Sequence, residues 1–369
     1  MRYRRLLIEV ESPEEMGGGA IRSNLTESSI RDRTLDELGV DLSGQVLAYG
    51  DHRGLPELRE QIVAGVDGLG PEHVLCTPGA AAALFFTATS LLSPQDHALI
   101  EQPNYATNLE TPQAVGADVE RVHLTLDGGF ALDVDRLAEA MRPSTTFVSV
   151  TTPHNPSGST LAAEQLESLV ELVERHGCWL LVDETYRDMT HGGPLPMAAS
   201  LSDRAISVGS MSKTYGLPGL RVGWVVTRHP ELAETLLAAK EQIVICGSTL
   251  DEAAALAVLE RRDELLPAIL ADIGQRLDTV SAWMAGQRDW LEWVEPTGGV
   301  VCFPRLRAEV IGDVDEFHRR LREEHGTFVG DGRWFDEDRR HFRLGFGWPT
   351  HDELADGLEA LHATAASLR

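Results

Sequence analysis

Apolar segments of strand length alternate with helical segments from about residue 55 to residue 228 of this chain. Runs rich in Val, Leu and Ile are typical of strands that are buried on both faces. We expect such strands at residues 73–77, 97–102, 119–125, 145–152, 179–184, 205–210 and 221–227. Apolar residues at three- and four-residue spacing predict helices at 55–66, 81–92, 133–141 and 162–176, with another after Tyr105. This alternation predicts an α/β fold with a mostly parallel sheet flanked by helices.

The pattern changes after about residue 228. A helix-rich stretch at 230–284 is followed by short strands around a Gly-Gly turn at 290–304, a helix near 314–325, a strand at 341–347 and a closing helix at 351–368. These elements predict a second, smaller α+β unit. We therefore expect an N-terminal segment at 1–45, a large domain at 46–245 and a small C-terminal domain at 246–369.

The charge of the chain argues against one class of function. The formal net charge is −26, whereas binding to nucleic acid requires a basic surface. No stretch approaches the ~20 apolar residues of a membrane span. The N-terminal apolar run is too short for a signal peptide, so we expect a cytoplasmic protein. The four cysteines lie far apart, and none has a histidine near it at the spacing of a metal ligand. We therefore expect no metal site.

Turns with special residues follow the first expected strands. The carboxyl ends of parallel strands meet at one edge of an open α/β sheet, where ligands bind. The turn TPGAAA at 77–82 leads into a helix, and the free backbone N–H groups of Gly79, Ala80 and Ala81 suit a phosphate. A turn that serves packing alone is the alternative. Tyr105 follows the next strand, where its ring faces a ligand or caps the core.

Two later turns add polar side chains to the same edge. Two prolines and a glycine shape the loop TTPHNPSG at 151–158, which holds Asn155 either for a ligand or in an ordinary turn. Asp183 ends an apolar strand, and Tyr186 follows it. A carboxylate at that place is costly to desolvate without a cationic or hydrogen-bonding partner, so we favour a functional role over a capping role.

The stretch SVGSMSKTYGLPGLRVG at 207–223 contains Lys213, one of only two lysines in the chain; the other is Lys240. A guanidinium stays charged and is a poor nucleophile, whereas an ammonium can lose a proton and act as an amine. Ser210, Ser212 and Arg221 surround Lys213 in the sequence and are suitable partners for a phosphate.

One ligand accounts for all these features. An aldehyde forms a Schiff base with an amine, a phosphate needs donors and an arginine, a pyridinium needs a carboxylate, and a flat ring needs a stacking face. That ligand is pyridoxal 5′-phosphate. Lys213 would bind its aldehyde, Asp183 its ring nitrogen and Tyr105 its ring face, so these three are the expected catalytic residues. The other expected cofactor contacts are Gly79, Ala80, Ala81, Asn155, Tyr186, Ser210, Ser212 and Arg221.

From about residue 47 to residue 348 the chain resembles the class I/II aminotransferases, which are pyridoxal-phosphate enzymes of fold type I. The patterns S-x-S-K-x-x-G-x-x-G-x-R-x-G at 210–223 and N-P-x-G at 155–158 carry most of the resemblance. It implies an aspartate-aminotransferase-like fold, with 46–245 as the cofactor-binding domain and 1–45 joining the small domain and the edge of the active site.

The resemblance also implies roles for further residues. Tyr49 resembles the tyrosine that reaches the phosphate in the neighbouring subunit, which implies a homodimer with shared active sites. Arg343 resembles the arginine that holds the substrate α-carboxylate, with Asn155 beside it. In the phosphate turn, Ala80 and Ala81 stand where relatives often carry polar side chains. The segment at 21–29 also departs from the family, so Glu27, Ser28 and His52 are only hypotheses for side-chain recognition.

The expected activity is transamination between an amino acid and a keto acid, with Lys213 as the base that removes the Cα proton. Elimination, oxidation or cyclisation of the amino acid are the alternatives, because the same cofactor supports all of them. A non-catalytic effector-sensing domain is a third possibility, which the acidic charge and the short segment before Tyr49 disfavour. A nicotinamide site is disfavoured because GLPGLRVG follows the wrong kind of turn.

Overall fold

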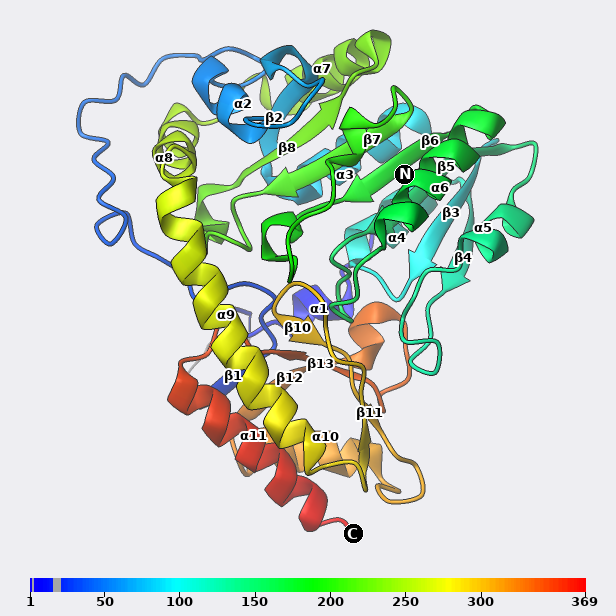
Figure 1. Cartoon of the computed structure of the whole chain (residues 1–369), viewed down its shortest axis with the longest axis vertical. Helices are drawn as coiled ribbons and strands as arrows, with labels where there is room; N and C mark the ends of the chain where they lie inside the picture. Colours follow the sequence, from blue (N-terminus) through cyan, green and yellow to red (C-terminus); the bar gives the residue numbers. More distant parts are fainter. Residues whose placement is uncertain (2, 16–20) are drawn as a thin grey trace.

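The computed structural model describes residues 1, 3–15 and 21–369. Its larger unit contains a seven-stranded sheet in the order β2-β8-β7-β6-β5-β3-β4 (Figure 1). Neighbouring strands are parallel except at β8, which runs antiparallel to both β2 and β7. The strands are β2 (Val74–Pro78), β3 (His97–Gln102), β4 (Asp118–His123), β5 (Thr145–Thr151), β6 (Trp179–Asp183), β7 (Ala205–Ser210) and β8 (Val222–Thr227).

Helices cover both faces of this sheet. Successive strand residues point to opposite sides, and apolar residues on each side pack against helices. Ala98 and Ile100 pack in one cluster with α3 (Gly79–Leu91), α4 (Ala106–Val115) and α7 (Pro230–Val244), whereas Leu99 packs in another with α6 (Ala163–His176) and α5 (Val134–Ala140). The helices α2 (Pro56–Ile62) and α8 (Thr249–Leu259) cover the β2 end. The predicted α/β fold is confirmed, although α2 ends at Ile62 and not at residue 66; Gly65, three residues further on, has φ +75°.

The smaller unit is built on a four-stranded sheet in the order β1-β12-β13-β10. Its strands are β1 (Ser23–Leu25), β12 (Thr327–Asp331), β13 (Phe342–Gly345) and β10 (Val301–Cys302), and β9 (Leu291–Glu292) pairs with β11 (Arg305–Leu306). The helices are α1 (Leu7–Val10), α9 (Arg262–Ala285), α10 (Val314–Glu323) and α11 (His351–Ala366). Short 3-10 helices occupy Pro71–His73, Arg187–Met189, Ala198–Ser200, Pro218–Leu220 and Gly332–Phe335. The parallel pairing of β1 with β12 brings the N-terminal segment into this sheet.

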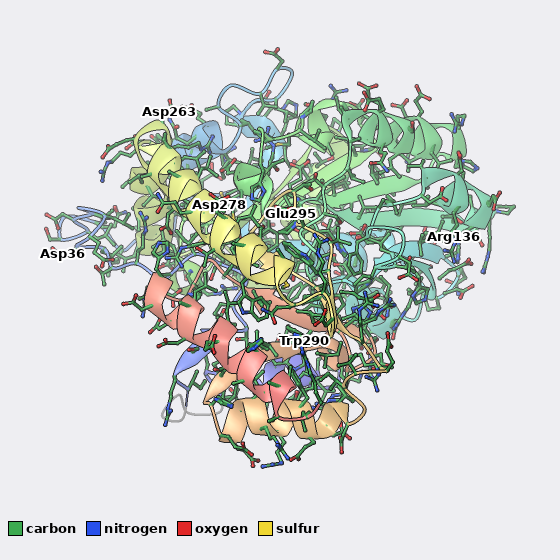
Figure 2. The ribbon with its side chains drawn as sticks, turned by 60° about the horizontal axis from the view of Figure 1, so that its bottom comes forward. Asp36, Arg136, Asp263, Asp278, Trp290 and Glu295 are labelled. Carbon is green, nitrogen blue, oxygen red and sulfur yellow. The ribbon has the colours of Figure 1, made fainter. Side chains whose placement is uncertain are left out.

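The long helix α9 connects the α8 end of the molecule to the smaller unit (Figure 1). Its inner face buries Ile273 and Val280, while Asp263 and Asp278 lie on its outer side (Figure 2). Trp290 is fully buried in the apolar cluster beneath α9 and α11. The domain boundaries at 45/46 and 245/246 stay predictions.

The described residues contain neither a membrane-spanning helix nor a cluster of metal ligands. None of their helices is both long and apolar enough to cross a membrane. They also contain no group of three or more His, Cys, Asp or Glu side chains that could hold a metal ion. The cytoplasmic location stays a prediction from the sequence.

Candidate active site

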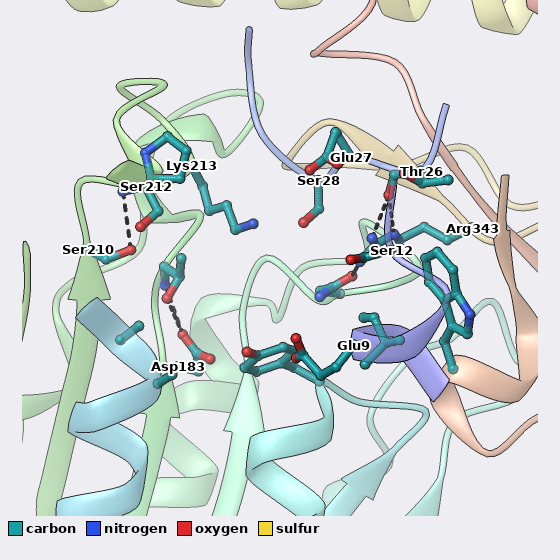
Figure 3. A pocket seen from close by; sticks show the side chains of 18 of the residues that line it. Glu9, Ser12, Thr26, Glu27, Ser28, Asp183, Ser210, Ser212, Lys213 and Arg343 are labelled. Atoms are coloured by element: carbon teal, nitrogen blue, oxygen red, sulfur yellow. Dashed lines mark hydrogen bonds between the residues drawn. The ribbon is translucent and has the colours of Figure 1, made fainter. Parts of the chain in front are cut away.

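A cavity of about 450 Å³ lies where the carboxyl ends of the large sheet face the smaller unit and the N-terminal segment (Figure 3). Residues from the two units meet in it because the parallel strands end at the same edge. The predicted residues that line it are Ala80, Ala81, Tyr105, Asn155, Asp183, Tyr186, Ser210, Ser212, Lys213, Arg221 and Arg343. The roles of these residues stay predictions, but the fold brings their side chains to one place.

One end of the cavity is suited to an anion. Helix α3 begins directly after β2 and has no side-chain cap, so its first N–H groups are available to a ligand. Arg221 adopts the left-handed backbone region at φ 50°, and its Nη1 donates to the carbonyl of Pro218 at 2.8 Å. Ser210 and Ser212 lie on the same side of the cavity as the Lys213 backbone (Figure 3).

Gly79 does not line the cavity but leaves room for the arginine that does. A Cβ atom on Gly79 would lie 2.4 Å from Nη2 of Arg221, and Gly79 has φ +78°. Both facts favour glycine, because a side chain would clash and the backbone conformation is costly for other residues. The cofactor contact of Gly79 stays a prediction, and the structure adds that its missing side chain leaves space for Arg221.

Replacing Gly79 with alanine should weaken cofactor binding by about tenfold or more, because displacing Arg221 loses a charge-assisted hydrogen bond. The left-handed backbone should also reduce the free energy of unfolding by about 1–3 kcal/mol. Titration of the apoenzyme with pyridoxal 5′-phosphate and urea unfolding measure the two effects. Gly219→Ala is the matched control, because a Cβ at Gly219 meets nothing within 4 Å. Equal affinities in the two variants would contradict the prediction.

Lys213 extends its amine into the middle of the cavity, between Ser212 on one side and Glu27 and Ser28 on the other (Figure 3). Burial lowers the pKa of Lys213 below its ordinary value of 10.5; nearby Glu27 opposes this shift, and the positive charge of Arg343 adds to it. A lysine with a lowered pKa holds a larger fraction of neutral amine near neutral pH. The surroundings therefore favour the form that attacks an aldehyde.

Asp183 ends β6 at the floor of the cavity and is 5% exposed. Burial raises the pKa of Asp183, while hydrogen bonds from Thr185 and Asn108 and the charge of Lys213 act in the opposite direction. The Thr185 hydroxyl donates to Oδ1 at 2.6 Å, its backbone N–H donates to the same oxygen at 3.1 Å, and Asn108 Nδ2 lies 3.5 Å from Oδ2. The carboxylate is thus oriented by its neighbours and available to a cationic partner.

Arg343 crosses from β13 into the cavity and is 5% exposed. Its Nε donates to the carbonyl of Thr26 at 3.1 Å, and its Nη1 donates to Oδ1 of Asn155 at 3.0 Å. Its guanidinium also lies over the ring of Phe335, 5.2 Å from the centroid. Tyr186 lines the same space, and burial raises its pKa to about 12. The guanidinium is therefore held in place for a planar anion such as a carboxylate.

Two of the residues named from the sequence lie elsewhere. Tyr49 is outside the cavity and 82% exposed. His52 is also outside, and its Nδ1 lies 2.6 Å from Oε1 of Glu241; its contact with a substrate side chain stays a hypothesis. Glu27 and Ser28, in contrast, both line the cavity.

Sequence reasoning missed the residues that support Asp183. Thr185 was recognisable, because Asp-x-Thr is a common pattern in turns closed by the aspartate side chain. Asn104 is fully buried, and its Oδ1 accepts from Asn108 Nδ2 at 3.1 Å and from the hydroxyl of Thr151 at 3.2 Å. Asn104 and Asn108 lie four residues apart, but nothing near them in the sequence indicates that they support Asp183. Asp183 is far away in the sequence.

The N-terminal segment was expected at the edge of the active site, but none of its residues before Glu27 was named from the sequence. Glu9 and Ser12 line the cavity beside Trp334 (Figure 3 labels the first two). The segment is attached to the smaller unit through Glu11, which accepts a hydrogen bond from Trp334 Nε1 at 2.8 Å and forms a salt bridge with Arg333 at 3.2 Å. Nothing in its local pattern predicts that it covers a ligand site.

A buried carboxyl supports the loop that carries Asn155. Glu101 is 2% exposed and accepts hydrogen bonds from the backbone N–H of Thr151 and from Nδ2 of Asn104. His154 follows in the same loop; its Nε2 contacts the carbonyl of Pro103 at 2.7 Å, so that nitrogen carries the proton. Burial lowers the pKa of His154 to about 4, whereas it raises that of Glu101 to about 8.

The raised pKa of Glu101 predicts a pH-dependent stability. Between pH 4.5 and pH 8 the folded chain keeps the proton of Glu101, whereas the unfolded chain releases it. The contribution of Glu101 to the free energy of unfolding is therefore complete below pH 4.5 and is lost as the pH rises towards 8. Glu101→Gln removes the titration and keeps an acceptor oxygen. Its unfolding free energy relative to the parent should therefore increase with pH by up to about 1.4 kcal/mol per unit. Urea unfolding at both pH values measures this; a difference that does not change with pH would contradict it.

The donor set fits pyridoxal 5′-phosphate. Arg221 and the uncapped start of α3 suit the phosphate, Asp183 suits a protonated ring nitrogen, and the amine of Lys213 suits the aldehyde. Any Cβ on Gly79 would fill the space that the Arg221 guanidinium occupies, so the glycine keeps this arginine at the start of α3. A mostly parallel sheet with this set at its carboxyl edge defines the pyridoxal-phosphate enzymes of fold type I.

Residues 23–361 match the family described as aminotransferase class I and II, and the chain belongs to this family. It is 32% identical over 352 residues to capreomycidine synthase of Streptomyces vinaceus, a match that covers 92% of this chain and 89% of the relative. It also resembles a PLP-dependent aminotransferase from Streptococcus suis 89-1591, with a TM-score of 0.91, 27% identity and coverage of 100% and 99% of the two chains.

A second solved structure is that of the PLP-dependent cyclase OrfR, with a TM-score of 0.90, 28% identity and coverage of 100% of this chain and 98% of the other. These comparisons confirm the predicted family, fold and cofactor. The protein is a pyridoxal-phosphate-dependent enzyme of the class I/II family.

Proposed function

We propose that the protein is an aminotransferase that moves the amino group of an amino acid to a 2-oxo acid. The observation that carries this proposal is the presence in one cavity of the Lys213 amine, the Asp183 carboxylate and the Arg343 guanidinium. These groups provide a base, a partner for a protonated ring nitrogen and a partner for an α-carboxylate. The similarity to an aminotransferase structure supports it.

Bound pyridoxal 5′-phosphate supplies an aldehyde for the amino group and a ring that withdraws electrons from Cα. Arg343 and Asn155 bind the α-carboxylate, which turns Cα towards Lys213. With the cofactor bound, the amine of Lys213 would take the proton from Cα and, as an ammonium, would hold it for the return step. Asp183 would keep the ring nitrogen of the cofactor protonated. Because the lysine acts as a neutral amine, its lowered pKa suits this role.

The test is to incubate the holoenzyme with a panel of single amino acids and either 2-oxoglutarate or pyruvate. Transamination gives the 2-oxo acid of the donor and glutamate or alanine in equal amounts. Free ammonia without a new amino acid would contradict the proposal. It would also be contradicted if the amino acid were consumed equally fast with and without an added 2-oxo acid acceptor.

Cyclisation is a second candidate, because a capreomycidine synthase and a PLP-dependent cyclase are among the similar proteins. A cyclase returns the cofactor to its starting form within each turnover and needs no amino acceptor. A cyclic amino acid formed without added 2-oxo acid, at the expense of one substrate alone, would therefore favour this candidate over transamination.

We also propose a homodimer in which Tyr49 reaches the neighbouring active site. The exposed side chains of Val46, Leu47 and Tyr49 support it, at 73%, 73% and 82% exposure. Apolar side chains clustered on one loop are typical of an interaction surface. Light scattering should give a mass of two chains, and Tyr49→Phe should weaken binding of pyridoxal 5′-phosphate without dissociating the dimer. A monomer that binds the cofactor with full affinity would contradict this proposal.

A further inference from the structure

The charged side chains of the cavity are not balanced once the cofactor and the α-carboxylate have their partners. Among the described residues, the lining cations are Arg5, Lys213, Arg221 and Arg343, and the lining carboxylates are Glu9, Glu14, Glu15, Glu27 and Asp183. The proposed function uses three of the cations and Asp183. Arg5 and four glutamates therefore remain for the rest of the substrate.

Within the described part of the chain, the cation that remains, Arg5, is already paired with a carboxylate. Arg5 Nη2 lies 3.1 Å from Oε2 of Glu15, and both side chains are more than half exposed. Glu9, Glu14 and Glu27 form no salt bridge with any residue in the ranges 1, 3–15 and 21–369. The part of the cavity under the N-terminal segment is consequently an acidic pocket, which we define as Glu9, Glu14 and Glu27.

Glu27 is the member of the acidic pocket whose position is best determined. It follows Thr26, whose carbonyl accepts the hydrogen bond from Arg343, so the α-carboxylate partner and Glu27 are positioned by adjacent residues. Its backbone also packs closely on β13, since a Cβ on Gly345 would lie 1.8 Å from the carbonyl oxygen of Glu27. Figure 3 shows Glu27 and Ser28 on the side of the cavity towards which Lys213 extends.

Ser28 adds a buried hydroxyl to this side of the cavity. It is 4% exposed and lies next to Glu27 in the lining. A carboxylate beside a buried hydroxyl is a suitable receptor for an N–H-bearing cation, because a charge-assisted hydrogen bond is stronger than a neutral one. A substrate carboxylate in the same place would face three glutamates and no free cation of the described residues, and this repulsion is costly at short range.

We infer that the substrate is an amino acid with a cationic side chain, an ammonium or a guanidinium, which the acidic pocket binds chiefly through Glu27. This inference rests on the proposed function, because it uses the α-carboxylate and cofactor contacts assigned there. It extends the function by naming a substrate class: the reacting amino group faces Lys213, and the far end of the side chain faces the N-terminal segment.

Arginine and citrulline provide the direct test, because they differ at the end of the side chain by a charged guanidinium against a neutral urea group. The dissociation constant of each is measured from the absorbance change of the cofactor in the holoenzyme, and kcat/KM is measured with pyruvate as acceptor. We expect arginine to be favoured over citrulline by about ten- to a hundredfold in binding. Lysine and ornithine should likewise be favoured over norleucine, and glutamate should bind worst.

Glu27→Gln tests the residue itself. It should weaken arginine binding by about tenfold or more and change citrulline binding by less than about twofold. Glu167→Gln, an exposed glutamate on α6 far from the cavity, is the matched control. An equal loss for arginine and citrulline would show that Glu27 only maintains the fold or the pKa of Lys213, and would overturn its assignment.

The two proposals fail in different ways. If norleucine or glutamate changes the absorbance as strongly as arginine does, the protein acts on amino acids but the acidic pocket does not select a cation, and the inference is overturned alone. Strong binding of glutamate would indicate that Arg5 binds the side-chain carboxylate of the substrate. If no amino acid changes the absorbance, the proposed function is overturned together with this inference.

Discussion

Lys213→Ala should lose activity by a factor of about 10³ or more, because a positioned base alone contributes about 10²- to 10⁴-fold and this lysine also anchors the cofactor. Lys213→Arg should be as inactive, since a guanidinium in a buried site stays protonated and cannot attack an aldehyde. In the parent enzyme the rate should rise with pH as the amine is deprotonated, and it should level off below the ordinary lysine value of 10.5, because burial lowers the pKa of Lys213.

The chain offers a direct control for this prediction. Its only other lysine is Lys240, which is fully buried and donates through Nζ to the carbonyl of His52 at 2.5 Å. Reduction of the holoenzyme with borohydride followed by peptide mass analysis should place the cofactor on the peptide with Lys213 and leave the peptide with Lys240 unmodified. Activity in Lys213→Ala or Lys213→Arg, or a label on Lys240, would contradict the assignment.

Asp183→Asn should reduce kcat by about 10²- to 10⁴-fold. An asparagine still accepts hydrogen bonds from Thr185 through its amide oxygen, but it carries no charge to keep a ring nitrogen protonated. Breaking a buried ion pair by removing one partner costs about 3–5 kcal/mol, which corresponds to a rate loss of that size if the pair is needed in the transition state. Steady-state kinetics with a saturating amino donor measure the loss.

Glu184→Gln is the matched control for Asp183→Asn. Glu184 is the next residue, is equally well buried, and accepts hydrogen bonds from the backbone of Ala198 at 2.7 Å and from Ser207 at 3.0 Å, away from the cavity lining. Burial raises its pKa to about 7, so the neutral amide resembles its protonated form. A loss in Glu184→Gln as large as that in Asp183→Asn would indicate that both substitutions act through the fold and not through the cofactor.

Much of the large unit could be predicted from local patterns. The seven strands and most of their helices were expected near their observed positions because burial on both faces requires apolar runs, and the helices require apolar residues at three- and four-residue spacing. The residues at the strand ends followed from the topology. Once the strands are parallel, Asp183, Asn155 and Lys213 must come to one edge of the sheet.

Helix boundaries and supporting residues were harder to predict. The 55–66 segment has a helical pattern beyond Ile62, yet α2 ends there, and Gly65 with φ +75° lies outside the helical conformation. Gly79 was expected as a donor to the phosphate, whereas its contact with Arg221 depends on how β2 and β8 pair. Asn104 and Asn108 support Asp183 across a tertiary contact, so their partner has no counterpart in the local sequence.

The sequence by itself determined the kind of fold, the cofactor and the group that reacts with it, because each depends on residue types at short spacings along one chain. Only the tertiary structure decided what lies opposite those groups. Arg343 meets the carbonyl of Thr26 across 317 positions, next to Glu27 in the cavity lining, and Glu11 holds the N-terminal segment against Arg333 and Trp334. Contacts of that kind arise when distant segments pack together, and no local periodicity specifies which segments will meet.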